Sequence, residues 1–513
     1  MEPVIVVGAG PVGLALALGL ARHEVPSVVL EAGDGAPVPR PARTCVLRSD
    51  TAALAQRLAG AAVLTGAHWR VWRTLRRRQT VHQEDFPPGD APFHLHQHAL
   101  TEALRTAAHH SELVRVAPHS RLVALEQRED GVRVRTAGQG EAAVEGSYLV
   151  GCDGARSTVR KLLDVRFPGR TSVERHAVAT LRAALPWPDE ALLHRDVPGG
   201  PAEVCARCLP GGQWRLDWPL PPRGDLVTPD ALLERVYATL TAWTGEREPS
   251  YELLDTGVHT VHQRLARRWR SGRAFLAGDA ARLLGALGTQ GVDEGLRDAD
   301  NLTWKLALAW HHGASPALLD SYQDERRGAS VARLRALDQA LPLVRGGALR
   351  SLLPGGRGPL TLLTEGHLGR GVLGAPGAYG ASPLTYGGGV PVGTAPGQVA
   401  EDVPVTTLDG ERHPLRQRLG RDLLVVLVAP GARVWDSRHW TRAGLMPELA
   451  AAVRGLPLPA EVLVTEAYPD AAAHTVLLVR PDGHLAAALP AADPGALRHA
   501  ADAVRGAAPG AEP

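Results

Sequence analysis

The sequence predicts an α/β protein with a doubly wound, largely parallel sheet, an inserted antiparallel sheet and a smaller C-terminal α/β domain. Three observations predict this class. The chain opens with an apolar β-branched run, a glycine turn and a helical pattern. Residues 170–270 alternate in short runs rich in Trp and Pro. A stretch crowded with Gly, Pro and Ala precedes two more apolar strands near the C-terminus. A length of 513 residues fits two or three domains.

The composition excludes several classes of function. The 56 Lys and Arg nearly balance the 54 Asp and Glu, so we expect no nucleic-acid partner and no anionic membrane surface. The start Met1-Glu2-Pro3 lacks the basic region of a signal peptide, and no apolar run is long enough to span a bilayer. We therefore expect a soluble, cytoplasmic protein.

The four cysteines form no disulfide framework. Cys205 and Cys208 make a CxxC pair, which alone could be half a zinc site or a redox pair. Because no second pair exists, two thiols on one strand is the favoured interpretation, and we expect no metal.

A glycine turn lies between the first predicted strand, Val4–Val7, and a helical pattern that begins at Pro11. Gly8 makes the tight turn, Gly10 lets the backbone approach a pyrophosphate, and Gly13 allows close helix–sheet packing. The helix N-terminus offers free N–H groups and a positive dipole to phosphate. The pattern therefore predicts dinucleotide binding.

Three acidic residues follow predicted strands. Glu31 ends the second strand, where its carboxylate can accept hydrogen bonds from ribose hydroxyls. Asp153-Gly154 follows the strand that ends at Val150; taken alone, it is an ordinary turn before an N-capping Ser157. Gly278-Asp279 follows a strand and precedes a glycine loop and a long helix, so this acid can accept from a polyol chain such as ribityl.

Together these segments resemble the FAD-dependent aromatic hydroxylases, the group A flavoprotein monooxygenases typified by para-hydroxybenzoate and phenol hydroxylases. The polyketide hydroxylases of actinomycete antibiotic pathways are the closer match. The resemblance runs over essentially the whole chain. It includes Leu319-Asp320-Ser321-Tyr322 with Glu325-Arg326, and it includes Leu478-Val479-Arg480-Pro481-Asp482-Gly483, which is similar to the thioredoxin-fold tail of larger members.

The resemblance implies a division into domains. Residues 1–170 and 271–368 would form a Rossmann-like FAD-binding domain, and residues 171–270 a substrate-binding β-sheet domain. Residues 369–397 would be a Gly/Pro-rich linker, and residues 398–513 a thioredoxin-like domain. That last domain has no cysteine, which excludes a redox role, so packing or a dimer contact is its expected role. A monomer and a homodimer both remain open.

The resemblance also implies the binding residues. The glycine turn and Glu31 would hold the ADP half of FAD, Arg43 and Gln97 the pyrophosphate and ribityl region, and Asp279 the ribityl O3′. The implied cofactor-binding residues are Gly8, Gly10, Pro11, Val12, Gly13, Glu31, Arg43, Gln97, Asp153, Gly154, Gly278, Asp279, Gly288, Gly291 and Val292. The substrate-pocket candidates are Gly285, Ala286, Leu287, Trp214 and Trp218.

Only one dinucleotide fingerprint is present, so the resemblance implies that NADPH or NADH docks transiently and passes a hydride to the flavin. Oxygen would then form a C4a-hydroperoxide that oxygenates a polycyclic aromatic, polyketide-type small molecule, as in antibiotic biosynthesis. The flavin would carry the chemistry, so no catalytic side chain is assigned. A Baeyer–Villiger-type oxygenation and a non-catalytic FAD-binding protein are the alternatives.

The chain departs from the family pattern after Gly278. Members usually have a histidine, two variable residues and then Pro-Pro-x-Gly-Gly, whereas this sequence has Arg282-Leu283-Leu284-Gly285-Ala286-Leu287-Gly288-Thr289, and Asp293 stands where asparagine is usual. Loss of both prolines means either drift or a widened pocket. Arg282 is a candidate charge partner for Asp293.

Two polar segments have plain interpretations. His94, His96 and His98 would share one face of an extended segment, and we expect exposed histidines rather than a catalytic base. The basic stretch Arg70–Arg78 predicts an exposed polar hairpin.

Overall fold

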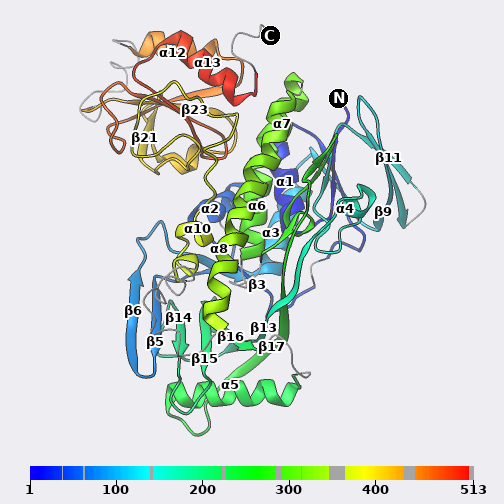
Figure 1. Ribbon diagram of the computed structural model, residues 1–513, viewed down its shortest axis with the longest axis vertical. Coiled ribbons are helices and arrows are strands. Elements are labelled where there is room, and N and C mark those ends of the chain that lie inside the picture. Colours follow the sequence, from blue (N-terminus) through cyan, green and yellow to red (C-terminus); the bar gives the residue numbers. More distant parts are fainter. Residues whose placement is uncertain are drawn as a thin grey trace.

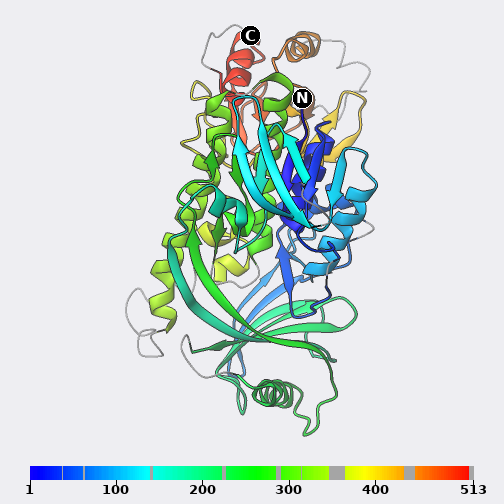
Figure 2. The same cartoon turned by 90° about the vertical axis from the view of Figure 1, so that its right-hand side faces the viewer.

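The computed structural model describes residues 1–36, 38–61, 64–138, 142–221, 227–284, 290–313, 315–345, 364–431 and 445–507. The side chains of residues 171–174, 290 and 339–345 are not among those described. The molecule is elongated, with the C-terminal domain at one end and the helix α5 (Pro229–Thr244) at the other (Figures 1 and 2).

A six-stranded sheet lies in the middle of the molecule, in the order β18-β19-β12-β1-β2-β8. Its strands are β1 (Val4–Val7), β2 (Ser27–Leu30), β8 (Val114–Ala117), β12 (Leu149–Gly151), β18 (Arg270–Ser271) and β19 (Ala274–Leu276). All neighbours are parallel except the β18–β19 pair at one edge. The predicted parallel α/β sheet is therefore present, and its apolar strands are buried as such sheets require.

The helices of this part of the chain are α1 (Pro11–Arg22), α2 (Ser49–Ala59), α3 (Gln97–His109), α4 (Thr158–Leu162), α6 (Gln290–His312), α7 (Pro316–Tyr322) and α8 (Gly328–Arg345). Of these, α1, α3 and α4 pack directly against strands of this sheet. The chain passes from α7 to α8 through a π-helical turn, η2 (Gln323–Arg327). α1 and α6 approach closely because Gly295 leaves room for Val12: a Cβ atom on Gly295 would overlap a methyl group of Val12.

The second sheet has eight strands in the order β20-β17-β13-β16-β15-β14-β5-β6. Its strands are β5 (Val71–Arg76), β6 (Gln79–Asp85), β13 (Gly169–Arg182), β14 (Glu190–Arg195), β15 (Glu203–Leu209), β16 (Gln213–Leu220), β17 (Glu252–Leu265) and β20 (Arg282–Leu283). α5 packs on one face of it, through a core that includes Trp218 and Leu232.

The second sheet takes a hairpin from the part of the chain expected to belong only to the FAD-binding domain. β5 and β6 form an antiparallel hairpin, as predicted for Arg70–Arg78, but β5 is not exposed as expected, because it pairs in parallel with β14. This pairing buries the Trp72 side chain, and burial of its apolar surface stabilises the position of the hairpin in the second sheet. The other boundaries of the division into domains stay predictions.

Two small sheets complete this part of the chain. β9 (Ser120–Gln127), β10 (Val132–Gly138) and β11 (Ala142–Gly146) form an antiparallel sheet where the sequence alternates. β3 (Thr44–Leu47), β4 (Ala67–His68) and β7 (Phe93–His96) form the other. Cys205 and Cys208 are buried free thiols on β15, as expected.

The C-terminal domain contains a six-stranded sheet in the order β22-β21-β24-β23-β25-β26. Its elements are β21 (Pro404–Thr407), β22 (Arg412–Pro414), η4 (Leu415–Arg418), β23 (Leu423–Val428), α12 (Met446–Arg454), β24 (Ala460–Thr465), β25 (Val476–Val479), β26 (Leu485–Leu489) and α13 (Pro494–Val504). The thioredoxin-like assignment stays a prediction. The Gly/Pro-rich segment before this domain contains the short helix α10 (Gly371–Gly374) and packs closely, since Tyr379 and Leu384 are buried.

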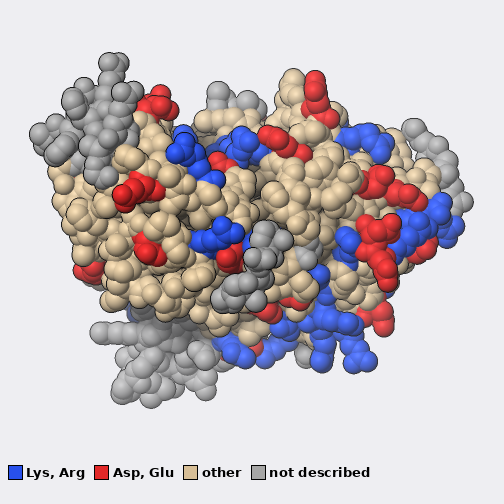
Figure 3. Space-filling model, turned by 90° about the horizontal axis from the view of Figure 1, so that it is seen from above, with Lys and Arg blue, Asp and Glu red and all other residues tan. Residues whose placement is uncertain are grey.

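Acidic and basic side chains are interspersed on the top of the molecule (Figure 3), in keeping with the near-neutral net charge of +2. Within the described ranges, no helix is long and apolar enough to cross a membrane. The same ranges hold no cluster of His, Cys, Asp or Glu suited to a metal ion.

Candidate functional site

The glycine turn after β1 is shaped by close backbone contacts. Gly8 has φ +106°, and a Cβ atom there would lie 2.6 Å from the carbonyl oxygen of Cys152. A Cβ atom on Gly13 would overlap the carbonyl oxygen of Gly8. By contrast, a Cβ atom on Gly10 would meet nothing within 4 Å. The turn is thus packed on its protein side and open above Gly10, at the N-terminus of α1, where a pyrophosphate can approach.

Glu31 lies at the carboxyl end of β2 and also supports the turn. Its carboxylate accepts hydrogen bonds from the backbone N–H of Ala9 at 2.8 Å and of Gly33 at 3.0 Å. A carboxylate offers about four acceptor positions, so acceptor capacity remains for ribose hydroxyls. Sequence reasoning assigned only the ribose role to Glu31; its hold on the turn depends on tertiary structure.

Arg43 and Gln97 lie next to each other. The backbone N–H of Gln97 donates to the carbonyl of Arg43 at 2.9 Å, which joins the start of α3 to the segment before β3. The Arg43 side chain is exposed and the Gln97 side chain is half-buried. The two predicted residues are therefore brought together with their side chains still accessible.

Asp153 follows β12 and caps the short helix α4. One carboxylate oxygen, Oδ2, accepts from the N–H groups of Thr158 at 2.6 Å and Val159 at 3.1 Å. The other, Oδ1, is buried and has no hydrogen-bond partner among the described residues. A buried acceptor left without a donor costs free energy, so this oxygen marks a place for a ligand donor. Gly154 beside it has φ +77° and open space around it.

Gly278 and Asp279 follow β19 in a tight turn. Gly278 has φ +60°, and its N–H donates to the carboxylate of Asp298 on α6 at 3.0 Å. Asp279 is accessible to solvent, yet the surrounding protein desolvates it and raises the pKa of its carboxyl group, with Arg282 and Arg43 opposing the shift. A Cβ atom on Gly291 would lie 3.6 Å from Asp279 Oδ1, so the first turn of α6 borders this carboxylate.

The first turn of α6 contains Asp293, whose partners differ from those expected. Asp293 pairs with Arg297 at 3.2 Å, and its Oδ1 accepts from the backbone N–H of Arg48 at 3.0 Å and from the hydroxyl of Thr51. Arg282 instead pairs with Asp298 at 2.5 Å. The expected Arg282–Asp293 pair is therefore wrong, because Asp293 is turned toward the start of α2 and Arg282 toward η1 (Gly278–Ala280).

Burial raises the pKa of Asp293, and Arg297 opposes the shift. The carboxylate of Asp293 thus faces Arg48 and Arg297 and not Asp279, and the charge of Arg297 balances its own. Val292 beside it packs against the main core. The predicted residues Gly285, Ala286, Leu287 and Gly288 lie outside the described residues.

The two tryptophans predicted for the substrate pocket lie in the core under α5. Trp218 is fully buried and donates from Nε1 to the hydroxyl of Thr239 on α5 at 3.0 Å, and Trp214 belongs to the same apolar cluster. Strand residues alternate between faces, so Arg215 and Asp217 occupy the opposite face of β16. The tryptophans pack under α5, and the opposite face of β16 carries the charged side chains.

That opposite face is polar, which sequence reasoning missed. Asp217 accepts from Arg207 at 2.8 Å and from Arg215 at 2.7 Å, and Arg215 also donates to the carbonyl of Ala42 at 2.7 Å. Burial lowers the pKa of His259 on β17 to about 4, with Arg215 adding to the shift, so this imidazole is neutral at physiological pH. The signal in the sequence was the Arg215-x-Asp217 spacing, which places both charges on one face of a strand.

The histidines around β7 are not the exposed group expected. His94 is fully buried, with Nδ1 at 2.8 Å from the carbonyl of Cys208 and Nε2 at 2.8 Å from the Thr44 hydroxyl. Burial holds its pKa well below the usual value, and Arg207 adds to the shift. The strand ends at His96, and Gln97 begins α3, so only His94 and His96 share the extended face. His94 joins two sheets and is neither exposed nor free to act as a base.

The predicted binding groups converge on one edge of the central sheet. The glycine turn, Glu31, Asp153 and Asp279 follow β1, β2, β12 and β19, which are adjacent and parallel, so all of these groups lie at the carboxyl ends of strands. At a strand spacing of about 4.8 Å, four neighbouring strands span roughly 14 Å, which suits an elongated dinucleotide. The open turn at Gly10 and the unpaired Asp153 Oδ1 fit FAD.

Comparisons with known proteins identify the family of this chain. A family model described as FAD binding domain matches residues 1–336. A 6-methylpretetramide 4-monooxygenase from Streptomyces rimosus is 32% identical over 94% of this chain and 90% of its own length. A dialkyldecalin synthase from Streptomyces rugosporus is 35% identical over 69% of this chain and 76% of its own length.

A solved structure shares the fold from end to end. The ternary complex of aklavinone-11 hydroxylase with FAD and aklavinone superposes with a TM-score of 0.73 at 23% identity, covering 98% of this chain and 99% of that one. At this identity the likeness shows the fold alone.

Proposed function

Since the chain belongs to the FAD binding domain family and is an FAD-dependent monooxygenase, we propose that it uses NADPH or NADH to oxygenate a polycyclic aromatic, polyketide-type small molecule. The overall reaction consumes the reduced nicotinamide, a proton and O₂, places one oxygen atom in the substrate and releases the other as water. FAD, when bound, supplies the redox chemistry by accepting a hydride and activating oxygen.

The observation that carries the proposal is the row of binding groups along one sheet edge. The N–H groups at the start of α1 would hold the pyrophosphate, and Glu31 would accept from the ribose hydroxyls. Asp279 would accept from the ribityl chain, and Asp153 Oδ1 is free to accept from a further cofactor donor. These residues bind and orient; none of them is required to break a bond.

The neighbourhood of α6 favours negative charge on the bound cofactor. α6 begins at Gln290, beside Asp279, and the N-terminus of a helix stabilises an anion. Asp293 would oppose this effect if its charge were free, but Arg297 balances it and the carboxylate faces α2. The acid at the usual asparagine position would therefore not oppose a bound cofactor that carries negative charge.

We propose the polar face of the eight-stranded sheet as the substrate side. It carries Arg215, Asp217 and His259 and adjoins Arg43, whose charge acts on both His259 and Asp279. A neutral histidine can accept a hydrogen bond from a phenolic hydroxyl. The name of the Streptomyces rimosus relative denotes a monooxygenase that acts on a methylpretetramide, and this supports a fused-ring substrate.

The test is an oxygen-labelling experiment with purified, FAD-loaded protein. It supplies NADPH or NADH separately, isotope-labelled O₂, and a panel of fused-ring and single-ring phenols. We expect substrate-stimulated oxidation of one nicotinamide and one labelled oxygen atom in a fused-ring product. A lactone or ring-expanded product would indicate a Baeyer–Villiger-type oxygenation instead.

Three outcomes would overturn the proposal. A rearranged product without labelled oxygen would indicate ring formation, the kind of reaction that the name of the dialkyldecalin synthase denotes. Absence of nicotinamide oxidation across the whole panel would support a non-catalytic role. Failure of the protein to take up FAD would contradict the proposed site itself.

A further inference from the structure

One turn of the C-terminal domain has no role in the proposed function. It consists of Arg480-Pro481-Asp482-Gly483, joins β25 to β26 and contacts η2 and α6. Gly483 has φ +82°, and its N–H donates to the carbonyl of Arg480 at 2.9 Å, which closes the turn. Both charged side chains of the turn are buried: the exposed fraction is 0% for Arg480 and 2% for Asp482. A charged turn buried to this extent must have partners.

The partner of Arg480 is Glu325 on η2. The two groups form a bidentate pair, with Arg480 Nη1 at 2.6 Å from Oε1 and Nη2 at 2.9 Å from Oε2. Glu325 also accepts from Lys305 at 2.6 Å. Burial alone would raise the pKa of Glu325, but the charges of Arg480 and Lys305 lower it well below its usual range. Asp482 completes the group by accepting from Asn301 on α6 at 2.8 Å.

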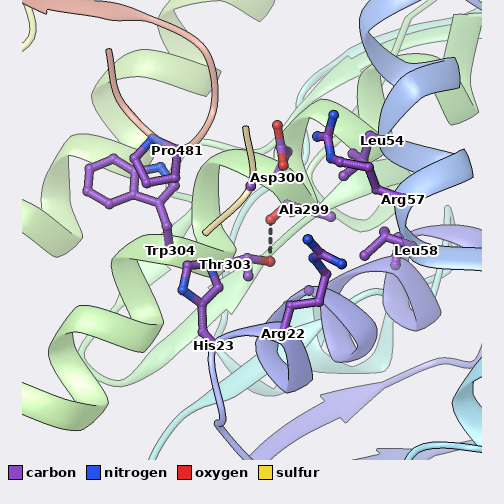
Figure 4. A pocket seen from close by; sticks show the side chains of 13 residues that line it. Arg22, His23, Leu54, Arg57, Leu58, Ala299, Asp300, Thr303, Trp304 and Pro481 are labelled. Atoms are coloured by element: carbon purple, nitrogen blue, oxygen red, sulfur yellow. Dashed lines mark hydrogen bonds between the residues drawn. The ribbon is translucent and has the colours of Figure 1, made fainter. Parts of the chain in front are cut away.

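The seam, where this turn of the C-terminal domain meets α1, α2 and α6, is closely packed on the Pro481 side. Figure 4 shows Pro481 beside Trp304 of α6, with Arg22 of α1, His23 directly after α1, and Arg57 of α2 around the same small cavity. That cavity has a volume of about 10 Å³, the size of one water molecule. The turn therefore occupies a fitted position between three helices. A larger cavity of about 630 Å³ borders the other side of the turn, between α2, α6 and the C-terminal domain, and Tyr379, Asp482 and Gly483 are among its lining residues.

The residue after Glu325 faces the cofactor side. Arg326 is fully buried and donates from Nε to Asp298 Oδ1 at 2.8 Å, and from Nη1 to the hydroxyl of Tyr379 at 3.1 Å. Tyr379 in turn stacks on His484, with ring centroids 4.1 Å apart, directly after the Arg480–Gly483 turn. π-Helical turns such as η2 occur frequently at functional sites. Two consecutive residues of η2 thus connect the C-terminal domain to α6.

The last contact reaches the proposed ribityl site. Asp298 receives Arg326 on Oδ1, while its Oδ2 accepts from the N–H of Gly278 at 3.0 Å and from Arg282 at 2.5 Å. Gly278 immediately precedes Asp279. Asp298 thus fixes the turn that contains Asp279, and Arg326 fixes Asp298. Arg326 is in turn bonded to Tyr379, which contacts the C-terminal domain.

We infer that the Arg480–Gly483 turn anchors the C-terminal domain to η2 and thereby positions the Gly278-Asp279 turn for FAD. The C-terminal domain is a clamp on the cofactor site, and Arg480, Glu325, Tyr379 and Arg326 are positioning residues that do not contact the cofactor. This role explains why a domain without cysteines carries a buried charged turn. The inference rests on the proposed cofactor site.

The test measures FAD affinity of the full-length apoprotein by fluorescence titration, below the unfolding temperature of each variant. We expect Arg480→Gln to raise the Kd for FAD about tenfold and Tyr379→Phe about threefold, and to alter the visible spectrum of the bound flavin. Arg418→Gln is the matched control, since Arg418 pairs with Glu461 inside the C-terminal domain at 2.5 Å and takes no part in the seam. Its Kd should stay within about twofold of the unsubstituted protein.

The outcomes distinguish a turn that positions the cofactor site from a turn that only stabilises the fold. Loss of thermal stability in Arg480→Gln and Tyr379→Phe with an unchanged Kd and spectrum would overturn the inference. If Arg480→Gln does not fold, Tyr379→Phe decides, because it removes only a hydroxyl group. If the unsubstituted protein binds no FAD, the proposed function fails instead, so the two failures are distinguishable.

Discussion

Gly8 packs against Cys152 so closely that a Cβ atom on Gly8 would lie 2.6 Å from the Cys152 carbonyl oxygen. This contact joins the turn after β1 to the segment after β12, and it holds two parts of the proposed FAD site in a fixed relation. Gly10, two residues farther on, has open space where a side chain would be. The two glycines therefore serve different purposes, which substitution can separate.

Gly8→Ala should destabilise the fold by ~3 kcal/mol or more, because alanine there combines a positive φ with a backbone clash. Gly10→Ala should leave the fold intact, since φ at Gly10 is −76° and its surroundings are open. It should nevertheless raise the Kd for FAD by about tenfold or more, since a methyl group would keep the pyrophosphate away from the backbone. Thermal unfolding and FAD titration of both variants check this pair. Equal loss of stability in both would contradict it.

Asp279→Ala should weaken FAD binding by about tenfold to a hundredfold, because it removes a hydrogen bond to a charged acceptor. The side chain is accessible to solvent, so the unfolding temperature should change little. Titration of the apoprotein with FAD measures the loss, and Asp130→Asn at an exposed turn is the control. An unchanged Kd would show that Asp279 does not bind the cofactor.

Asp300→Asn should stabilise the protein above neutral pH. Burial raises the pKa of Asp300 to about 7, with Arg57 opposing the shift and Asp482 adding to it. The native state therefore holds a proton that the unfolded chain releases, and stability falls as pH rises from the unfolded pKa of about 4 to about 7. The amide removes that loss, so we expect a gain of ~1–2 kcal/mol at pH 8 and none below pH 4.

Unfolding of Asp300→Asn at both pH values measures this difference. Asp230→Asn, at an exposed position in the first turn of α5, is the control and should show no pH-dependent gain. A gain of equal size at low pH would mean that packing, and not the titration of Asp300, is responsible.

Trp218→Phe should lower stability by ~1–2 kcal/mol, since it removes core volume and the hydrogen bond to Thr239. The KM for the aromatic substrate should not change, because Trp218 faces α5. Trp310→Phe removes a similar hydrogen bond, to the Glu2 carbonyl, at the surface and should cost less. Steady-state kinetics and thermal unfolding together decide. A raised KM at unchanged stability would indicate that Trp218 lines the substrate pocket.

The sequence by itself determined the cofactor and predicted the residues that would bind it. A strand, a tight turn and a helix start are local events, so residue type and spacing singled out the glycine turn, Glu31 and Asp279, while Asp153 was added by the family resemblance. Their convergence followed from one rule, that parallel strands place their carboxyl ends at one edge. The family and the enzyme class then agreed with the comparisons.

Tertiary structure alone decided which face each side chain took and which charges paired. Trp214 and Trp218 were sound candidates as aromatic residues, but the alternation of β16 and the position of α5 buried them and turned Arg215 and Asp217 to the other side. Arg282 pairs with Asp298 and Asp293 with Arg297, although the sequence suggested a direct pair. The Arg480–Glu325 pair joins residues 155 positions apart. No local pattern encodes such a contact, because its partners meet only when two domains have packed.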